Sequence, residues 1–194
     1  YYYPAKDENC IYAFYKELSD NTDLGILLYN NFEVMNIDVP LTVLRRLKEL
    51  PNVVGIKDCT PAFFKMTRCV QEIGDKVSVI NGHGEFLEPY AALAGTAGFI
   101  SSMSNFVPER AKAIWEARSS GDYLKAKEIR DTLVPYMDLA AKYSGMGGEY
   151  KVISLLKYIT DEVGSCGGWP RIPCLPLTDE EKKEVREVLK RIGK

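Results

Sequence analysis

Short apolar segments alternate four times with amphipathic segments along residues 1–119. Each apolar segment is rich in aliphatic residues and is bracketed by turn residues, a pattern typical of a buried strand. The segments end near Tyr29, Lys57, Asn81 and Met103, at intervals of about 22 to 28 residues, the length of one strand-plus-helix unit. The sequence therefore predicts a parallel sheet with helices outside it, and places its strands at 24–29, 53–57, 77–80 and 98–103.

Apolar residues at helical spacing, together with capping residues, fill the segments between these strands. They predict helices at 7–20, 40–50, 60–74, 85–94 and 108–118, and a loop at 30–39. After residue 120 the alternation stops, and three helices are predicted at 121–143, 148–163 and 179–192, the last opening with a capping box of Thr178 and Glu181. We therefore expect a β/α part at 1–119 and a helical C-terminal extension at 120–194.

A doubly wound sheet and a (β/α)₈ barrel both satisfy this alternation. The dinucleotide-binding fingerprint GxGxxG follows none of the predicted strands. A barrel needs about eight units, so either four more precede residue 1 or two chains pair. The chain lacks an initiator Met and opens on YYYP, which looks like the tip of a strand whose body lies upstream. We expect an α/β fragment: an incomplete (β/α)₈ TIM barrel with about the last four βα units.

Composition narrows the classes of partner and cofactor. The formal charge is −2, which disfavours nucleic acid and anionic membranes as partners. No apolar run is long enough to span a bilayer, and the N-terminus has neither the basic nor the apolar region of a signal peptide. Five cysteines without a CxxC motif suit reduced thiols in the cytoplasm, and a single histidine argues against a metal site. No metal and no other cofactor is expected.

Lys57 is the residue with the most distinctive setting, because it ends the apolar run VVGI. Lysine is depleted in strands and almost never fully buried without a partner or a function. One interpretation places Lys57 at the rim of the sheet, with its stem reaching outward to solvent. The other directs it into a pocket, where desolvation lowers its pKa and the neutral amine attacks a carbonyl to form a Schiff base. The strand alone favours the first interpretation.

In (β/α)₈ enzymes the active site lies at the C-terminal ends of the strands, so the residues there are the candidates. They offer one amine and several phenols, without a carboxylate pair, a combination that suits carbinolamine chemistry with a tyrosine as proton relay. A glycine among them allows the backbone to approach a substrate closely. The candidates are Tyr1, Tyr2, Tyr29, Lys57, Gly82, His83, Ile100 and Ser101.

Six motifs, taken in order and spacing, carry a family resemblance: YYYP, ILLYNN, VVGIKD, VINGHGE, GFISSMSNFVPE and WPRIPCLPLTDEE. With them the chain resembles the C-terminal two-thirds of the dihydrodipicolinate synthase / N-acetylneuraminate lyase family of Schiff-base (β/α)₈ lyases. The resemblance implies that Lys57 forms the imine, that Tyr29 relays protons and that Tyr2 is offered across a subunit interface. It also implies that Gly82 and Ile100 line the pyruvyl end of the site, and that the enzyme is a homotetramer acting on a small 2-keto acid.

Two departures from the family pattern bear on activity and substrate. The family's GTTGE-type loop, which holds the substrate carboxylate, is absent, so we expect the 194-residue chain alone not to turn over. The synthase branch reads YNxPxRTG, and its arginine grips aspartate semialdehyde; here Val34 stands at the arginine position. Losing a bidentate carboxylate clamp argues against that substrate.

The strand end SNFVPE and the tail GGWPRIPCLPLTDEE look more like those of the aldolases and dehydratases of 2-keto-3-deoxy sugar acids. This resemblance implies an aldolase or dehydratase of such a sugar acid as the function. His83 and Glu85 are candidates to hydrogen-bond its polyol end, although His83 is equally well explained as a solvated loop residue, and Ser101 is a further candidate for binding the substrate. The alternatives are 4-hydroxy-tetrahydrodipicolinate synthase of lysine biosynthesis and a non-catalytic or truncated half-barrel that needs a partner.

Overall fold

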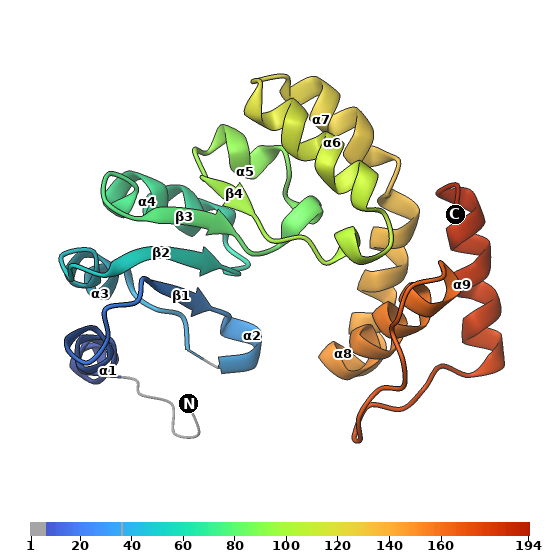
Figure 1. Cartoon of the computed structure of the whole chain (residues 1–194), viewed down its shortest axis with the longest axis horizontal. Helices are drawn as coiled ribbons and strands as arrows, with labels where there is room; N and C mark the ends of the chain where they lie inside the picture. Colours follow the sequence, from blue (N-terminus) through green and yellow to red (C-terminus); the bar gives the residue numbers. More distant parts are fainter. Residues whose placement is uncertain (1–6, 36) are drawn as a thin grey trace. The chain divides into compact units, whose positions relative to one another are not determined.

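Four parallel strands form a sheet in the order β1-β2-β3-β4. The structure is a computed structural model that describes residues 7–35 and 37–194. The order of the strands in the sheet is the same as their order in the chain, as expected when successive strand-plus-helix units lie next to one another. This confirms the predicted α/β fold with a parallel sheet (Figure 1). The strands are β1 (Ile26–Asn30), β2 (Val53–Asp58), β3 (Ser78–Asn81) and β4 (Gly98–Phe99).

Three helices cover one face of this sheet: α1 (Glu8–Asp20), α3 (Leu41–Leu47) and α4 (Phe63–Ile73) (Figure 1). Leu28, Ile56 and Val79 point into the core beneath them and are almost fully buried. Because side chains alternate between the two faces of a strand, the intervening residues Tyr29 and Lys57 project from the opposite face. The core therefore lies on one side of the sheet and the candidate catalytic residues on the other.

Two predicted segments of the first half are wrong in detail. The expected loop at 30–39 contains a short helix, α2 (Phe32–Met35). The expected helix at 85–94 is replaced by a 3₁₀ turn, η1 (Gly84–Phe86), and a short helix, α5 (Tyr90–Leu93). Pro89 lies between them and has no N–H to continue a helix, and Gly84 has a φ of 58° that regular helix does not allow.

The expected strand at 98–103 is shorter than predicted, because the chain turns into η2 (Met103–Asn105) soon after Phe99. The next helix, α6 (Pro108–Ser119), is the one predicted at 108–118. It packs against α7 (Tyr123–Asp131).

The helices after residue 120 are divided differently from the prediction. The break falls at Thr132–Leu133, just before Pro135 in the first turn of α8 (Val134–Glu162), where proline is tolerated because its missing N–H has no helical partner. The predicted break at 144–147 is wrong, although Gly148 carries a φ of 60° within α8. The last helix, α9 (Asp179–Arg191), begins with the predicted capping box of Thr178 and Glu181.

The chain divides into two compact units, Tyr1–Ser101 and Ser102–Lys194. Within the described residues, none of the helices combines the length and the apolar character needed to cross a bilayer. In the same residues no three His, Cys, Asp or Glu side chains gather as a metal ion would require. All five cysteines are free thiols.

Candidate active site

Lys57 and Tyr29 meet at the C-terminal ends of β2 and β1. The two residues are partners in the parallel pairing of the strands, so their side chains leave the sheet at the same level and on the same face. The Lys57 Nζ lies 4.0 Å from the centroid of the Tyr29 ring. A charged ammonium on the face of a phenol is attracted by the quadrupole of the ring.

The burial of Lys57 is intermediate between the two interpretations, a lysine at the solvent-facing rim of the sheet and a lysine in a dry pocket. Lys57 is partly buried, so its amine is neither extended into solvent nor sealed from it. Tyr29 is 47% exposed, and its hydroxyl accepts a hydrogen bond from Asn31 Nδ2 at 3.0 Å. The amine packs on the ring while the hydroxyl remains accessible. This arrangement brings together one nucleophile and one proton donor or acceptor.

A row of buried polar residues lies one position further along the strands, on the helix-covered face. Asn30, Asp58 and Asn81 are the last residues of β1, β2 and β3, and they are in register with one another. All three are fully buried, and Asn30 Nδ2 donates to Asp58 Oδ1 at 2.7 Å. Burial raises the pKa of the Asp58 carboxyl, and the hydrogen bond from Asn30 opposes that shift.

This row was not predicted from the sequence. Its signal in the sequence is a polar residue directly after each apolar strand, in the dipeptides YN, KD and IN. Asn81 closes the row by donating to the Gly84 carbonyl at 2.9 Å and to Glu88 Oε1 at 3.1 Å. These contacts fix the turn after β3 and explain why polar side chains are retained at buried positions.

Gly82 follows this row, and its lack of a side chain has a packing reason. A Cβ atom there would lie 2.2 Å from Cys59 Sγ and 2.8 Å from the Asp58 carbonyl oxygen. The Gly82 N–H donates to that same carbonyl at 2.9 Å. Gly82 therefore packs closely against the end of β2 and the residue after it.

The residues proposed to bind the polar end of a substrate make contacts within the protein. The His83 ring is partly buried, and its Nε2 lies 2.9 Å from the Thr60 carbonyl oxygen. Glu85 is 1% exposed and accepts a hydrogen bond from the Ser101 hydroxyl. Burial raises the pKa of Glu85. Glu85 therefore does not present its carboxylate to solvent, whereas His83 is only partly buried.

The other predicted positions lie apart from these contacts. Ile100 is 47% exposed, and its N–H donates to the Asn81 carbonyl at 3.1 Å, which places it beside the end of β3. Val34 lies on α2 and is 61% exposed. Tyr2 lies outside the described residues.

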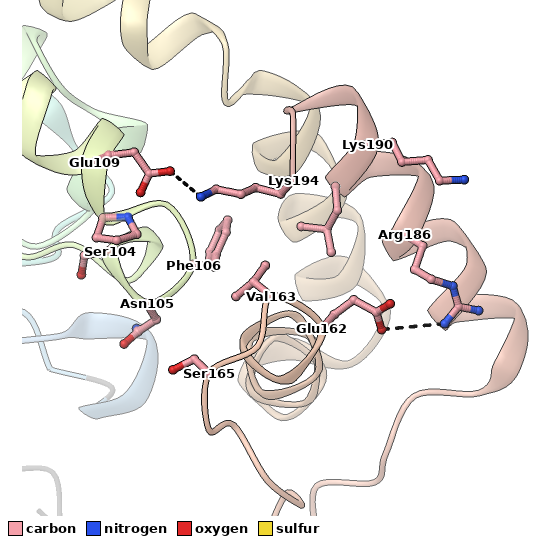
Figure 2. Close-up of a pocket in the computed structure, with 12 residues that line it drawn as sticks. Ser104, Asn105, Phe106, Glu109, Glu162, Val163, Ser165, Arg186, Lys190 and Lys194 are labelled. Atoms are coloured by element: carbon pink, nitrogen blue, oxygen red, sulfur yellow. Dashed lines mark hydrogen bonds and ion pairs between the residues drawn. The ribbon is translucent and has the colours of Figure 1, made fainter.

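The second unit holds a cavity of about 760 Å³ that contains none of the predicted site residues (Figure 2). Phe106, Val163 and Leu189 give it apolar walls. Two ion pairs border it: Lys194 with Glu109, and Arg186 with Glu162 at 3.8 Å. These pairs tie α9 to α6 and to the end of α8, so the basic side chains lining this cavity already have acidic partners.

Comparison with known proteins assigns the chain to a family. A model described as the dihydrodipicolinate synthetase family matches residues 1–192. A 4-hydroxy-tetrahydrodipicolinate synthase of Parvibaculum lavamentivorans is 30% identical over 192 residues, which are 99% of this chain and 63% of the relative. The chain thus spans about 63% of the length of this relative.

Solved structures agree. A dihydrodipicolinate synthase from Thermotoga maritima has 28% identity and a TM-score of 0.84, over 98% of this chain and 63% of that one. The synthase from Aquifex aeolicus has 26% identity and a TM-score of 0.85, over 98% of this chain and 62% of the other.

Proposed function

The chain belongs to the dihydrodipicolinate synthetase family, and on that premise we propose that Lys57 forms a Schiff base with a 2-keto acid such as pyruvate. The observation that carries the proposal is the position of the Lys57 amine, at the C-terminal end of β2 and 4.0 Å from the Tyr29 ring centroid. Its unprotonated nitrogen attacks the keto carbon to give a carbinolamine, and loss of water then gives the imine. The imine withdraws electrons from the adjacent carbon, which becomes the nucleophile or the carbanion of the next step.

Tyr29 is the proposed proton relay for these steps. Its hydroxyl donates a proton to the carbinolamine oxygen as water leaves, and it recovers that proton when the imine is hydrolysed. Support comes from the register of Tyr29 with Lys57 and from the exposed hydroxyl, which Asn31 holds in place at 3.0 Å. A group that moves protons must reach both the substrate and bulk water, and a half-exposed phenol does both.

For the overall reaction, the alternative of the sequence analysis has the better support. The relatives are named 4-hydroxy-tetrahydrodipicolinate synthase, whereas the sugar-acid reading rested on loop and tail motifs. The proposed reaction is therefore condensation of a Lys57-bound pyruvate with aspartate semialdehyde. Burial of Glu85 against Ser101 supports the same choice, because it removes a carboxylate that had been assigned to a polyol.

Val34 keeps the lyase of a 2-keto-3-deoxy sugar acid as a second candidate. The side chain is exposed on α2, at the position where the synthase branch carries its arginine. Valine has no donor with which to hold a carboxylate. A polyol chain in place of aspartate semialdehyde does not need that arginine.

The architecture proposed for this function is part of a (β/α)₈ barrel, about its last four units, followed by three helices as an extension. The four parallel strands and the 62% coverage of the solved relatives support it. In this arrangement residues 1–119 belong to the barrel and 120–194 to the extension. Assembly into a homotetramer and a cytoplasmic location are predictions from the family resemblance; light scattering of the purified chain tests the first.

Trapping with borohydride tests the Schiff base. The chain is incubated with pyruvate and reduced, and the peptides are mapped by mass spectrometry. We expect a carboxyethyl adduct on Lys57 and none on the partly buried Lys48, with no adduct in Lys57→Arg. Adducts spread over the surface lysines, or none at all, would overturn the proposal.

A substrate comparison then separates the two candidates. Because the 194-residue chain alone is expected not to turn over, it is joined to the upstream segment of a family synthase that carries the carboxylate-binding loop. Condensation with aspartate semialdehyde and cleavage of 2-keto-3-deoxygluconate are assayed side by side in this fusion, with the wild-type sequence and with Val34→Arg. The synthase assignment predicts condensation in the wild type and a lower KM for aspartate semialdehyde in the variant. Cleavage of the sugar acid without condensation favours the second candidate.

A further inference from the structure

The buried side-chain amide of Asn30, which follows Tyr29 in β1, donates hydrogen bonds to the carboxylates of Asp38 and Asp58. Asn30 Nδ2 donates to Asp58 Oδ1 at 2.7 Å and to Asp38 Oδ1 at 2.9 Å. The Asn30 Oδ1 accepts the N–H of Val39 at 3.1 Å. Asn30 and Asp58 are in register one residue beyond Tyr29 and Lys57, so this contact joins the tips of the two strands that carry the proposed catalytic pair.

Lys65, in the first turn of α4, supplies the positive charge of this cluster. Its ammonium donates to Asp38 Oδ1, and also to the Val39 carbonyl at 2.8 Å. The Lys65 side chain is only 15% exposed. Two carboxylates on one buried amide repel each other strongly, and a cation within hydrogen-bond distance of one of them offsets that repulsion.

The cluster controls the positions of both strand ends and of the segment after β1. The backbone carbonyl of Asn30 accepts the N–H of Cys59 at 2.8 Å, so β1 is joined to the end of β2 by main chain and side chain together. Asp38 and Val39 close the other end of the segment that carries α2. Movement of this cluster therefore displaces Tyr29 relative to Lys57.

We propose that Lys65 is a positioning residue for the Lys57–Tyr29 pair. Its positive charge offsets the repulsion between the Asp38 and Asp58 carboxylates, which both accept from the Asn30 amide. The ends of β1 and β2 then keep the register that holds the Lys57 amine over the Tyr29 ring. Lys65 lies on α4, on the helix-covered side of the sheet, whereas Lys57 and Tyr29 project from the opposite face. The catalytic value of this positioning rests on the proposed function; the positioning itself does not.

Nuclear magnetic resonance tests the positioning without any substrate. The Tyr29 ring shifts the Lys57 ε-methylene protons upfield, because the terminal nitrogen lies 4.0 Å from the ring centroid. We expect this shift in wild type, its loss in Lys65→Met, and its recovery in Lys65→Arg, which restores the charge. Lys76→Met is the matched control, since Lys76 is an exposed lysine paired with Glu49. An unchanged shift in Lys65→Met overturns the proposal.

Hydrogen exchange at the Val39 amide gives an independent measurement, because its acceptor is the Asn30 side chain. Loss of a hydrogen bond that depends on a charged group is expected to speed this exchange by about tenfold or more in Lys65→Met and not in Lys76→Met. Equal exchange in the two variants contradicts the proposal. If Lys65→Met does not fold, the double variant Lys65→Met/Asp38→Asn is used, in which the excess carboxylate charge is gone. Restored folding in the double variant supports the charge argument, and failure to restore it refutes it.

Pyruvate trapping separates this proposal from the proposed function. A displacement of about 1 Å costs up to about 100-fold in rate, so trapping on Lys57 should slow by about 10- to 100-fold in Lys65→Met and recover in Lys65→Arg. Equal trapping rates in wild type and Lys65→Met refute the positioning role while the Schiff base stands. No trapping in wild type refutes the Schiff base, and the ring-current shift and the exchange rate then decide the positioning alone.

Discussion

Replacing Gly82 with alanine tests the close packing at the ends of β2 and β3. The new methyl group would meet Cys59 Sγ at 2.2 Å and the Asp58 carbonyl oxygen at 2.8 Å. The thiol can turn away about its χ1 bond. The carbonyl cannot, because it accepts the Gly82 N–H at 2.9 Å and belongs to the buried end of β2.

Overpacking of this kind typically costs about 1 to 3 kcal/mol, because the neighbours must shift from well-packed positions. For a chain of this length, that corresponds to a decrease in Tm of about 2 to 12 °C. Because the backbone contact is the one that cannot relax, we expect most of this cost to remain in a Cys59→Ala background.

Urea and thermal unfolding, followed by circular dichroism, measure the effect. Gly145→Ala is the matched control, because Gly145 lies in α8 with nothing within 4 Å of a Cβ atom. Alanine in an exposed helix interior should stabilise the protein by about 0.5 to 1 kcal/mol. The reasoning is refuted if Gly82→Ala is as stable as wild type, or if Cys59→Ala removes the whole cost.

Three further changes test the site, the charges and a cap. Tyr29→Phe keeps the ring beside Lys57 but removes the hydroxyl, so pyruvate trapping should slow by about 10²- to 10⁴-fold. The midpoint of urea unfolding should stay nearly constant, because the Tyr29 side chain is half-exposed and contributes little to stability. Glu72→Gln should lower the free energy of unfolding at neutral pH. Hydrogen bonds from Arg45, the largest cause, and from Arg68 lower the pKa of the Glu72 carboxyl to about 2. The ionised form stabilises the fold above the unfolded pKa and this contribution disappears as pH falls towards 2, so unfolding curves of wild type and variant should converge in acid; a constant gap would contradict this. Thr178→Ala should cost about 1 kcal/mol through loss of the N-cap, measured by urea unfolding, with Thr178→Ser retaining most of the stability.

The periodicity of apolar residues was enough to predict the parallel sheet and the approximate places of its strands. Strands near Tyr29, Lys57 and Asn81 are short, apolar and bounded by turn residues, so local pattern and tertiary burial agree there. The position of Lys57 at a strand end follows from the same pattern. Its packing on the Tyr29 ring does not, because it depends on the register between two strands far apart in the sequence.

The helix boundaries after residue 120 were less predictable. A run of helix-forming residues spans α7 and the start of α8, and the break at Thr132–Leu133 depends on a proline in the next first turn. The glycines near 145–148 suggested an end to the helix, yet α8 continues through them. Tertiary packing of the flanking apolar residues outweighs the local cost of glycine.

The polar cluster behind the site could not be assembled from local sequence. Asn30, Asp38, Asp58 and Lys65 come from two strand ends, a loop and a helix, and each alone is an ordinary surface residue type. Burial of the Asn30 amide is tolerated because it donates to both carboxylates and accepts the Val39 N–H. Sequence patterns identify four separate polar residues, and only the folded structure shows that hydrogen bonds connect them.

The central claim is that the Lys57 nitrogen bonds to the carbon of a 2-keto acid. Nuclear magnetic resonance of the chain labelled with ¹⁵N-lysine and mixed with pyruvate ¹³C-labelled at its keto carbon observes that bond directly. The account predicts an imine carbon coupled to one lysine nitrogen, a signal that is absent in Lys57→Arg and present in Lys76→Met. An imine signal that persists in Lys57→Arg, or no imine carbon at saturating pyruvate, would contradict it.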